Sequence, residues 1–392
     1  MELITVKFED PILRICPNGR IDANNAGEAE TAILAAVEAH PTENVIFDAD
    51  GLEYISSAGL RIVLRLRKKK PLLRVINAST EVYEIFEITG FSEMLPVEKA
   101  YRRLSVDGCE VIGKGAKGTV YRYNGDTIIK VYNDSDCLPD IQRERELART
   151  AFVLGVPTAI PYDIIKVGDK FGSVFELLDA ESYSKLVVEH PEKLDEYADD
   201  FAKLLKIIHA TQVKPGDMPD GRDRVRGWIK TCSQYLSAED TAAFSALVEA
   251  LPERTTMLHC DYHTNNIMRQ NGETLLIDMD TLSYGHPVIE LANVYITYCG
   301  FNEIVPDNTD GFMGIPGDLA AKFWKAFLPR YLETDDPARV RDVEKKAMLL
   351  SYARLLHYET RHAKKPEYAE LSKQLCPKRI HELLQEIHSL EF

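Results

Sequence analysis

The segment Leu258–Met268, LHCDYHTNNIM, together with the segment Leu275–Asp280, LLIDMD, decides the fold of most of this chain. The first segment carries a carboxylate at Asp261 and a side-chain amide at Asn266, five residues later. The second reads as a buried strand that ends at Asp278. A carboxylate can orient a hydroxyl group and accept its proton, and Mg²⁺ prefers oxygen ligands. This order predicts Asp261 as a general base and Asn266 and Asp278 as metal ligands, although each alone could be a cap or a turn residue.

A glycine-rich turn lies upstream, in the segment Val111–Val120, VIGKGAKGTV. It contains the pattern G-x-G-x-x-G-x-V, whose glycines let a hairpin backbone approach phosphate oxygens. The residues of this pattern are Gly113, Gly115, Gly118 and Val120. Lys130 follows in the apolar strand Thr127–Tyr132, where a kinase holds the α- and β-phosphates of its nucleotide. Alone, these features could be a plain turn and an edge-strand lysine. With the two segments above, they indicate phosphoryl transfer.

A helix predicted over residues 141–148 offers a partner for Lys130. We expect Glu146 to pair with the ammonium group and hold it in place, with Glu144 as the alternative. The competing interpretation is an exposed, charge-laced helix face, which is preferred for Glu144.

Residues from about 105 to 392 resemble the aminoglycoside phosphotransferase and choline kinase branch of the protein-kinase-like fold. The segment 259–266 is similar to that family's H-G-D-x-H-x-x-N motif, and 277–280 to its I-D-x-[DE] motif. The segment 285–292 is similar to the G-x-P-x-x-[DE]-L-A stretch that follows. One departure is Cys260, which stands where the family has glycine.

The resemblance implies a two-lobed kinase that depends on ATP and Mg²⁺. Asp261 would be the catalytic base, and Asn266 and Asp278 would be the metal ligands. It also implies a hinge between the lobes, placed at 175–178, where Glu176 and Leu178 would meet the adenine.

The first hundred residues alternate strand and helix signals, which indicates an α/β layer structure. Residues 1 to about 98 resemble the STAS domain, the fold of anti-sigma factor antagonists, in the segments 19–23, 48–51, 54–61 and 89–91. Members of that family use a serine at a helix N-terminus as a phosphorylation switch. Ser57 keeps its place in the motif and is the better candidate phosphoacceptor, with Ser56 second. The alternative is that Ser56 is a plain helix cap and that Ser57 serves capping or packing.

The expected organisation has four parts. A STAS-like α/β regulatory or interaction domain covers residues 1–98, and a linker covers 99–107. A small β-rich lobe with the glycine-rich loop covers 108–180. A large, mainly helical lobe with the catalytic and metal-binding motifs covers 181–392.

The composition limits the classes of partner that this chain is expected to bind. The chain has 392 residues, and 62 acidic against 47 basic side chains leave a net charge of −15. Such a charge repels nucleic acid and anionic membranes. The seven cysteines form no C-x-x-C pair, and no signal peptide or membrane span is evident in the sequence. These features predict a cytoplasmic protein with reduced thiols.

Three hypotheses about function follow. The first is an ATP- and Mg²⁺-dependent phosphotransferase that acts on a hydroxyl group of a small molecule and is regulated by the STAS-like domain, through which a protein partner could bind. A cationic, aminoglycoside- or choline-like acceptor would suit an acidic chain. The second is a signalling kinase that phosphorylates a serine of its own or a partner's STAS domain. The third is a non-catalytic, nucleotide-sensing binding protein of the anti-sigma type, which the intact set of Lys130, Asp261, Asn266 and Asp278 disfavours.

Overall fold

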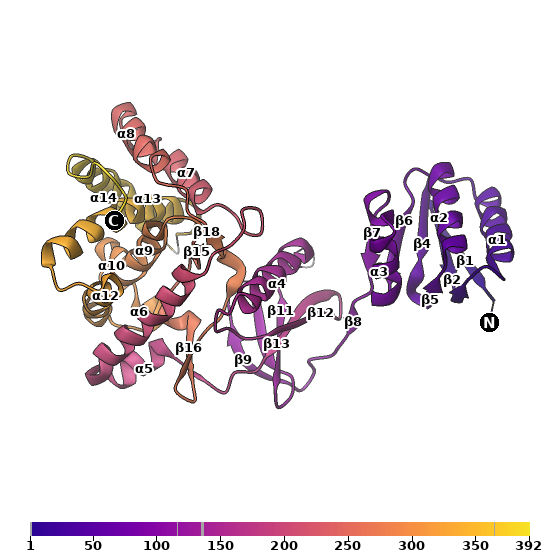
Figure 1. Ribbon diagram of the computed structural model, residues 1–392, viewed down its shortest axis with the longest axis horizontal. Coiled ribbons are helices and arrows are strands. Elements are labelled where there is room, and N and C mark those ends of the chain that lie inside the picture. The colour runs from indigo at the N-terminus through magenta and orange to yellow at the C-terminus, as the bar shows by residue number, and fades with distance from the viewer. Residues whose placement is uncertain (1, 116, 135–136, 364) are drawn as a thin grey trace. The chain divides into compact units, whose positions relative to one another are not determined.

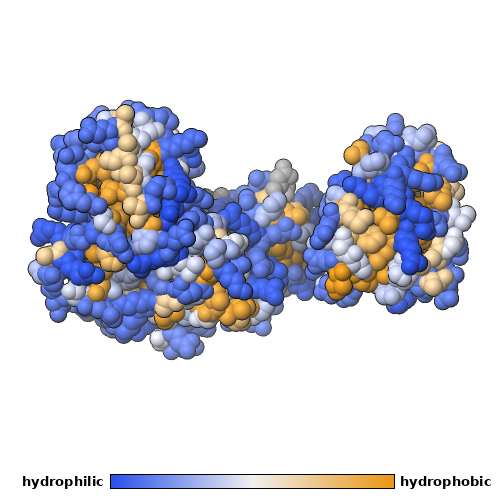
Figure 2. Space-filling view, turned by 45° about the horizontal axis from the view of Figure 1, so that its top comes forward, coloured by the Kyte–Doolittle hydropathy of each residue, from blue (hydrophilic) through white to orange (hydrophobic). Residues whose placement is uncertain are grey.

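The computed structural model describes residues 2–115, 117–134, 137–363 and 365–392. It divides the chain into two compact units, Met1–Leu104 and Ser105–Phe392. Each unit has a hydrophobic core of its own. Figure 1 shows the elements of both units, and Figure 2 shows a surface on which hydrophilic residues predominate over scattered hydrophobic ones.

The first unit is an α/β layer built around a sheet of strand order β1-β2-β4-β6-β7. β1 and β2 are antiparallel, whereas the pairs that follow are parallel. Apolar strand side chains such as Phe47 and Val75 pack against helix residues such as Val63 and Phe86, and all four are fully buried. The elements are β1(Ile4–Glu9), β2(Ile12–Pro17), β3(Gly19–Ile21), α1(Ala26–Ala39), β4(Asn44–Asp48), β5(Leu52–Ile55), α2(Ser57–Lys69), β6(Arg74–Ala78), α3(Thr80–Ile88) and β7(Val97–Lys99). The predicted α/β alternation is confirmed.

The second unit begins with a β-rich lobe. Five of its strands follow the order β12-β13-β11-β10-β9, and every neighbouring pair among them is antiparallel. A helix, α4, packs on β12 and β13. The elements are β9(Glu110–Lys114), β10(Gly118–Arg122), β11(Thr127–Tyr132), α4(Leu138–Val153), β12(Pro161–Val167) and β13(Lys170–Glu176), while β8(Arg102–Arg103) precedes them.

The remainder of this unit is mainly helical. Its helices are α5(Tyr183–Glu189), α6(Leu194–Ala210), α7(Gly221–Cys232), α8(Ala238–Glu249), α9(Pro287–Tyr295), α10(Phe301–Ile304), α11(Asp310–Met313), α12(Gly317–Leu332), α13(Pro337–His362) and α14(Pro366–Leu384). Its strands are short: β14(Glu181–Ser182), β15(Met257–Leu258), β16(Ile267–Gln270), β17(Glu273–Leu276) and β18(Ser283–Tyr284). A small β-rich lobe followed by a large helical lobe is the fold class that the sequence predicts.

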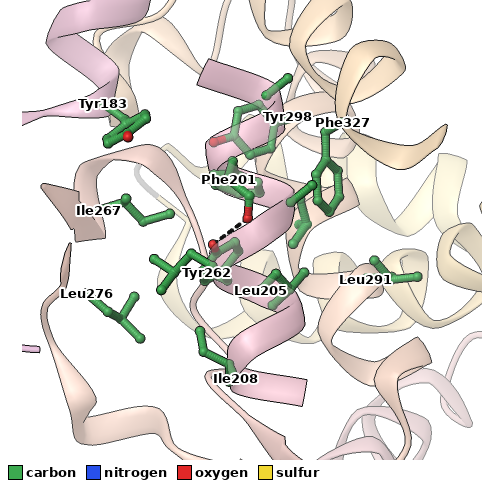
Figure 3. Packing of buried hydrophobic residues seen from close by; sticks show 14 of the residues in the cluster. Tyr183, Phe201, Leu205, Ile208, Tyr262, Ile267, Leu276, Leu291, Tyr298 and Phe327 are labelled. Carbon is green, nitrogen blue, oxygen red and sulfur yellow. Dashed lines mark hydrogen bonds between the residues drawn. The ribbon is translucent and has the colours of Figure 1, made fainter. Parts of the chain in front are cut away.

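Aromatic rings fill the centre of the helical lobe. Phe201 of α6 is fully buried and meets the rings of Tyr262, Tyr298 and Phe327 at centroid distances of 4.3, 5.9 and 4.9 Å. Figure 3 shows this packing around α6. Because Tyr262 directly follows Asp261, the core itself positions the loop that carries the predicted base.

Candidate active site

Lys130 and its carboxylate partner come from a strand and a helix of the β-rich lobe. Lys130 Nζ lies 2.7 Å from Oε1 of Glu144, and Oε2 of Glu144 accepts a hydrogen bond from the Tyr132 hydroxyl at 2.9 Å. Glu144 is only 5% exposed. The prediction that Glu146 forms this pair is wrong, because the buried face of α4 is formed by positions 141, 144, 147, 148 and 151, whereas Glu146 is exposed.

The charge of Lys130 is secured by two carboxylates. Burial alone would lower the pKa of its ammonium group, but the charges of Asp278 and Glu144 raise that pKa above its ordinary value. Asp278 Oδ1 lies 3.6 Å from Lys130 Nζ. Lys130 is therefore a fixed cation at neutral pH, placed to contact an anionic group.

The glycine-rich loop joins β9 to β10. A Cβ atom on Gly118 would lie 2.4 Å from the carbonyl oxygen of Val131, so a side chain there would push β10 away from β11. Gly115 donates its N–H to the carbonyl of Gly118 at 2.9 Å, which closes the loop. Gly113 stands opposite Val120 in the β9–β10 pair. The packing explains why position 118 is glycine, while the contacts of all four residues with a nucleotide stay predictions.

A buried carboxylate shapes the loop that carries Asp261. Glu290 of α9 is fully buried and accepts the N–H groups of His259 at 2.5 Å and of Cys260 at 3.0 Å. Burial raises the pKa of Glu290 to about 7, although these two donors act in the opposite direction. Cys260 has a φ of 65°, in the left-handed region where a glycine would be unstrained. The hydrogen bond from the Cys260 N–H to Glu290 stabilises this backbone conformation, although the residue is not the expected glycine.

Tyr262 anchors the same loop from the other side. Its hydroxyl donates a hydrogen bond to the carbonyl oxygen of Phe201 at 2.7 Å, the dashed line in Figure 3. The Tyr262 side chain is 1% exposed. Asp261 thus projects from a backbone held at Cys260 by α9 and at Tyr262 by α6.

Two cationic or hydrogen-bonding side chains face the carboxylate of Asp261. His263 Nε2 lies 3.5 Å from Oδ2, and a guanidinium nitrogen of Arg354 lies 3.6 Å from Oδ1. Burial works to raise the pKa of Asp261, but the hydrogen bond and charge of His263 and then the charge of Arg354 hold it well below its usual range. The side chain remains 31% exposed, so this ionised carboxylate can be reached by an acceptor.

Asn266 and Asp278 lie at the same end of one hairpin. Ile277 donates its N–H to the carbonyl of Asn266 at 2.9 Å, so the hairpin strands β16 and β17 bring the two residues together. Asn266 Nδ2 also donates to the main-chain carbonyl of Asp261 at 3.0 Å. Asp278 lies beyond the end of β17, with a φ of 64°, whereas the sequence predicted the strand to reach it. The structure gathers Lys130, Asp261, Asn266 and Asp278 in one place.

The predicted hinge, 175–178, covers the last two residues of β13 and the two residues after it. Glu176 ends that strand and accepts the N–H of Ile160 at 3.2 Å through Oε2. Leu177, the next residue, donates its N–H to the main-chain carbonyl oxygen of Asp126 at 2.8 Å. Leu178 is half-buried. The adenine contacts expected of Glu176 and Leu178 stay predictions.

A small cavity opens near the loop that carries Asp261. Its volume is about 20 Å³, and it is lined by Phe301, Asn308, Phe312, Tyr358, Glu359 and Tyr368. The ring of Phe312 packs 5.2 Å from the ring of His263. Tyr358 lies one helical turn beyond Arg354 on α13. The cavity is therefore lined in part by neighbours of His263 and Arg354, the two side chains that face Asp261.

Sequence reasoning missed the roles of Arg354, His263 and Glu290. Glu290 lies in the quoted segment 285–292 and His263 in the segment 259–266, so a signal for both was present. Arg354 lies outside the motif segments of the sequence, and only the packing of α13 brings it to Asp261.

In the first unit, Ser56 and Ser57 begin α2. Ser56 is the N-cap residue, and its hydroxyl accepts the N–H of Gly59 at 3.4 Å. Ser57 is the first residue of the helix and is exposed. The structure assigns Ser56 the capping role and leaves the Ser57 side chain at the surface.

Comparison with known proteins identifies both units. The family model described as "Phosphotransferase enzyme family" matches residues 108–343. This chain belongs to that family. It is a kinase-type phosphotransferase that acts on hydroxyl groups. The STAS domain model matches residues 4–104, and the protein described as "Putative anti-sigma factor antagonist BtrV" of Bordetella bronchiseptica is 36% identical over 98 residues, which are 24% of this chain and 84% of BtrV.

Solved structures that match parts of this chain include two aminoglycoside phosphotransferases and one protein described as a "putative anti-sigma factor antagonist". A thermostable mutant of aminoglycoside phosphotransferase APH(4)-Ia is 14% identical, over 70% of this chain and 94% of its own, with a TM-score of 0.49. The streptomycin–ATP complex of APH(2")-IIa is 16% identical, over 79% and 98%, with a TM-score of 0.46. A protein of Thermotoga maritima described as a "putative anti-sigma factor antagonist" is 13% identical, over 24% of this chain and 86% of its own, with a TM-score of 0.24. Over the residues that the structure describes, the helices are all too short or too polar to cross a membrane.

Proposed function

We propose that the second unit transfers the γ-phosphoryl group of ATP, in the presence of Mg²⁺, to a hydroxyl group of a small molecule. The observation that carries this proposal is the convergence of a paired strand lysine, Lys130, with Asp261, Asn266 and Asp278 in one site. Membership of the phosphotransferase family supports the reaction class. The STAS domain is proposed to regulate the transfer or to bind a protein partner.

The donor set fits Mg²⁺ bound together with phosphates. Asn266, Asp278 and Asp280 offer amide and carboxylate oxygens, the ligands that this cation prefers. Within the described part of the chain, no three His, Cys, Asp or Glu side chains are grouped so that they could hold a metal ion by themselves. Mg²⁺ is commonly bound by one or two carboxylates plus substrate phosphates, so the nucleotide would complete the site.

Each residue of the site has a separate role in the proposed transfer. Asn266 and Asp278 would hold Mg²⁺, which would supply positive charge that neutralises the phosphates. Lys130, held by Glu144, would contact the phosphates from the side of the β-rich lobe. Asp261, ionised throughout the neutral range, would accept a hydrogen bond from the acceptor hydroxyl, orient it and take its proton. Glu290 and Tyr262 keep the loop in place while this happens.

The cavity beside Asp261 supports a cationic acceptor. It presents aromatic rings and the carboxyl group of Glu359, and both attract an ammonium group. A volume of about 20 Å³ suits a group of about the size of one water molecule, such as a primary ammonium, better than a trimethylammonium group. Arg354 repels a cation from the immediate vicinity of Asp261. A primary amino alcohol, with its hydroxyl at Asp261 and its ammonium group at Glu359, fits both features.

The experiment compares wild type with Asp261→Asn, with Asp199→Asn as a matched control, because the side chain of Asp199 on α6 is 47% exposed. ADP release is measured over a panel of primary amino alcohols, choline-like alcohols, aminoglycosides and neutral sugars. Loss of a general base costs about 10²- to 10⁴-fold in turnover, while affinity for Mg-ADP should stay within about threefold. Unchanged turnover of Asp261→Asn, or loss of nucleotide binding by it, would contradict the proposed role.

A second candidate is a signalling kinase whose acceptor is Ser57. The relationship to an anti-sigma factor antagonist and the exposure of Ser57 at the start of α2 favour it. A phosphate there would face free N–H groups and the positive end of the helix dipole. Peptide mass spectrometry of wild type and Asp261→Asn after incubation with Mg-ATP tests this candidate, with Ser57→Ala and Ser56→Ala beside them. A phosphate on Ser57 in wild type alone would favour the signalling kinase, and an unmodified chain would exclude self-phosphorylation.

A further inference from the structure

The side chain of Lys117 in the glycine-rich loop contacts the acidic turn that follows strand β17. The ammonium group of Lys117 forms an ion pair with the carboxylate of Asp280, which lies 163 positions later in the chain. The Lys117 side chain is 66% exposed, whereas that of Asp280 is 14% exposed. A loop from the β-rich lobe is thus tied to the segment that carries Asp278.

The backbone at Lys117 is held, so only its side chain needs to move. Asn133 donates its N–H to the carbonyl of Lys117 at 2.9 Å, and Gly115 bonds to Gly118 across the loop. Lysine has four flexible side-chain carbons and a compact charge that can contact phosphates. An exposed ion pair contributes little to stability, so the contact with Asp280 is easily exchanged for another.

Two lysines and two aspartates meet in this region. Lys130 Nζ lies 3.6 Å from Asp278, and Lys117 contacts Asp280, two residues further along the chain. Both aspartates are candidate oxygen ligands of Mg²⁺. A divalent cation near Asp280 would repel the ammonium group of Lys117, while the phosphates of a nucleotide would attract it.

We propose that Lys117 is a phosphate-binding residue that changes partner: it pairs with Asp280 in the free protein and with the nucleotide phosphates in the complex. The inference rests on the proposed use of Mg-ATP. Lys117 then has two opposite effects. It competes with metal for Asp280 when no nucleotide is bound, and it strengthens the binding of a nucleotide that carries the metal.

The experiment uses the full chain with Lys117→Gln, Lys117→Arg and, as matched control, Lys114→Gln, which removes the same charge from the last residue of β9, next to the loop. Calorimetry measures the dissociation constant of Mg-ADP, and electron paramagnetic resonance measures binding of Mn²⁺ alone. Lys117→Gln should weaken Mg-ADP binding about tenfold or more, because a charge-assisted hydrogen bond is lost. It should tighten Mn²⁺ binding severalfold. Lys117→Arg should keep most of the Mg-ADP affinity, and Lys114→Gln should change both constants less than about threefold.

Two results would overturn the inference while leaving the proposed function intact. One is the same loss of Mg-ADP affinity in Lys117→Gln and Lys114→Gln, which would reduce the effect to net charge. The other is weaker Mn²⁺ binding by Lys117→Gln, which would mean that Lys117 does not compete with metal for Asp280. Failure of wild type to bind Mg-ADP would instead refute the proposed function and, with it, the phosphate-binding role of Lys117.

Discussion

Replacing Glu144 by glutamine should lower the stability of the β-rich lobe and its affinity for a nucleotide. The same change at Glu146 should leave both unchanged. The bond between Lys130 Nζ and Glu144 Oε1 is 2.7 Å long, and the two side chains are 18% and 6% exposed. A hydrogen bond to a charged group contributes about 1.5–3 kcal/mol. That energy corresponds to a change of about ten- to a hundredfold in an equilibrium constant. Glutamine can still accept the Tyr132 hydroxyl through its amide oxygen, so the loss should come from the ammonium contact.

The effect on nucleotide binding follows from the second neighbour of Lys130. Asp278 Oδ1 lies 3.6 Å from the same ammonium group. Without Glu144, Lys130 should turn towards Asp278 and neutralise a metal ligand instead of contacting the phosphates. We therefore expect Mg-ADP affinity to fall about tenfold or more in Glu144→Gln.

Hydrogen exchange with mass spectrometry can locate the loss of stability. Peptides from β11 and α4 should exchange about ten- to a hundredfold faster in Glu144→Gln, because exchange reports the free energy of local opening. Glu146→Gln removes the same charge from the same helix at an exposed position, where substitutions usually change stability by less than about 0.5 kcal/mol. Equal exchange rates in the two variants, or a larger effect at Glu146, would refute the assignment of Glu144 as the partner.

Three further predictions concern the helical lobe. Arg354→Gln should raise the pKa of Asp261 and move the acidic limb of the pH–rate profile to higher pH, and Arg354→Lys should restore part of the wild-type profile. An acidic limb that stays in place would contradict the effect of the Arg354 charge on Asp261. Cys260→Gly should be about 1 kcal/mol more stable than Cys260→Ala, because only alanine keeps the strain at a φ of 65°. Urea denaturation followed by the fluorescence of the two tryptophans, in α7 and α12, measures this difference, and equal stability would contradict it. Glu290, with its pKa raised from 4.5 to about 7, favours folding below pH 4.5 and loses that contribution as the pH rises through 7. The same assay from pH 4 to 8 should show this slope in wild type and not in Glu290→Gln.

The sequence by itself determined the two-domain organisation and the fold class, and it supplied the candidate site residues. These depend on local patterns: alternating apolar positions in the first unit, a glycine-rich hairpin, and candidate site residues a few positions apart on one loop and one hairpin. The partner of Lys130 was also within reach. Positions 141, 144, 148 and 151 share one helix face, and applying that periodicity to α4 would have favoured Glu144 over Glu146.

Only the tertiary structure decided which distant groups act on these residues. Arg354 reaches Asp261 because α13 packs beside the catalytic loop, and Lys117 meets Asp280 because two lobes of one unit face each other. Glu290 keeps Cys260 in a glycine-like conformation from a helix thirty residues away. Such contacts depend on how helices and strands pack, and neither residue of a pair shows its partner in the sequence around it. The local pattern therefore determines the chemistry that the chain carries, and the packing determines the charges and donors that tune it.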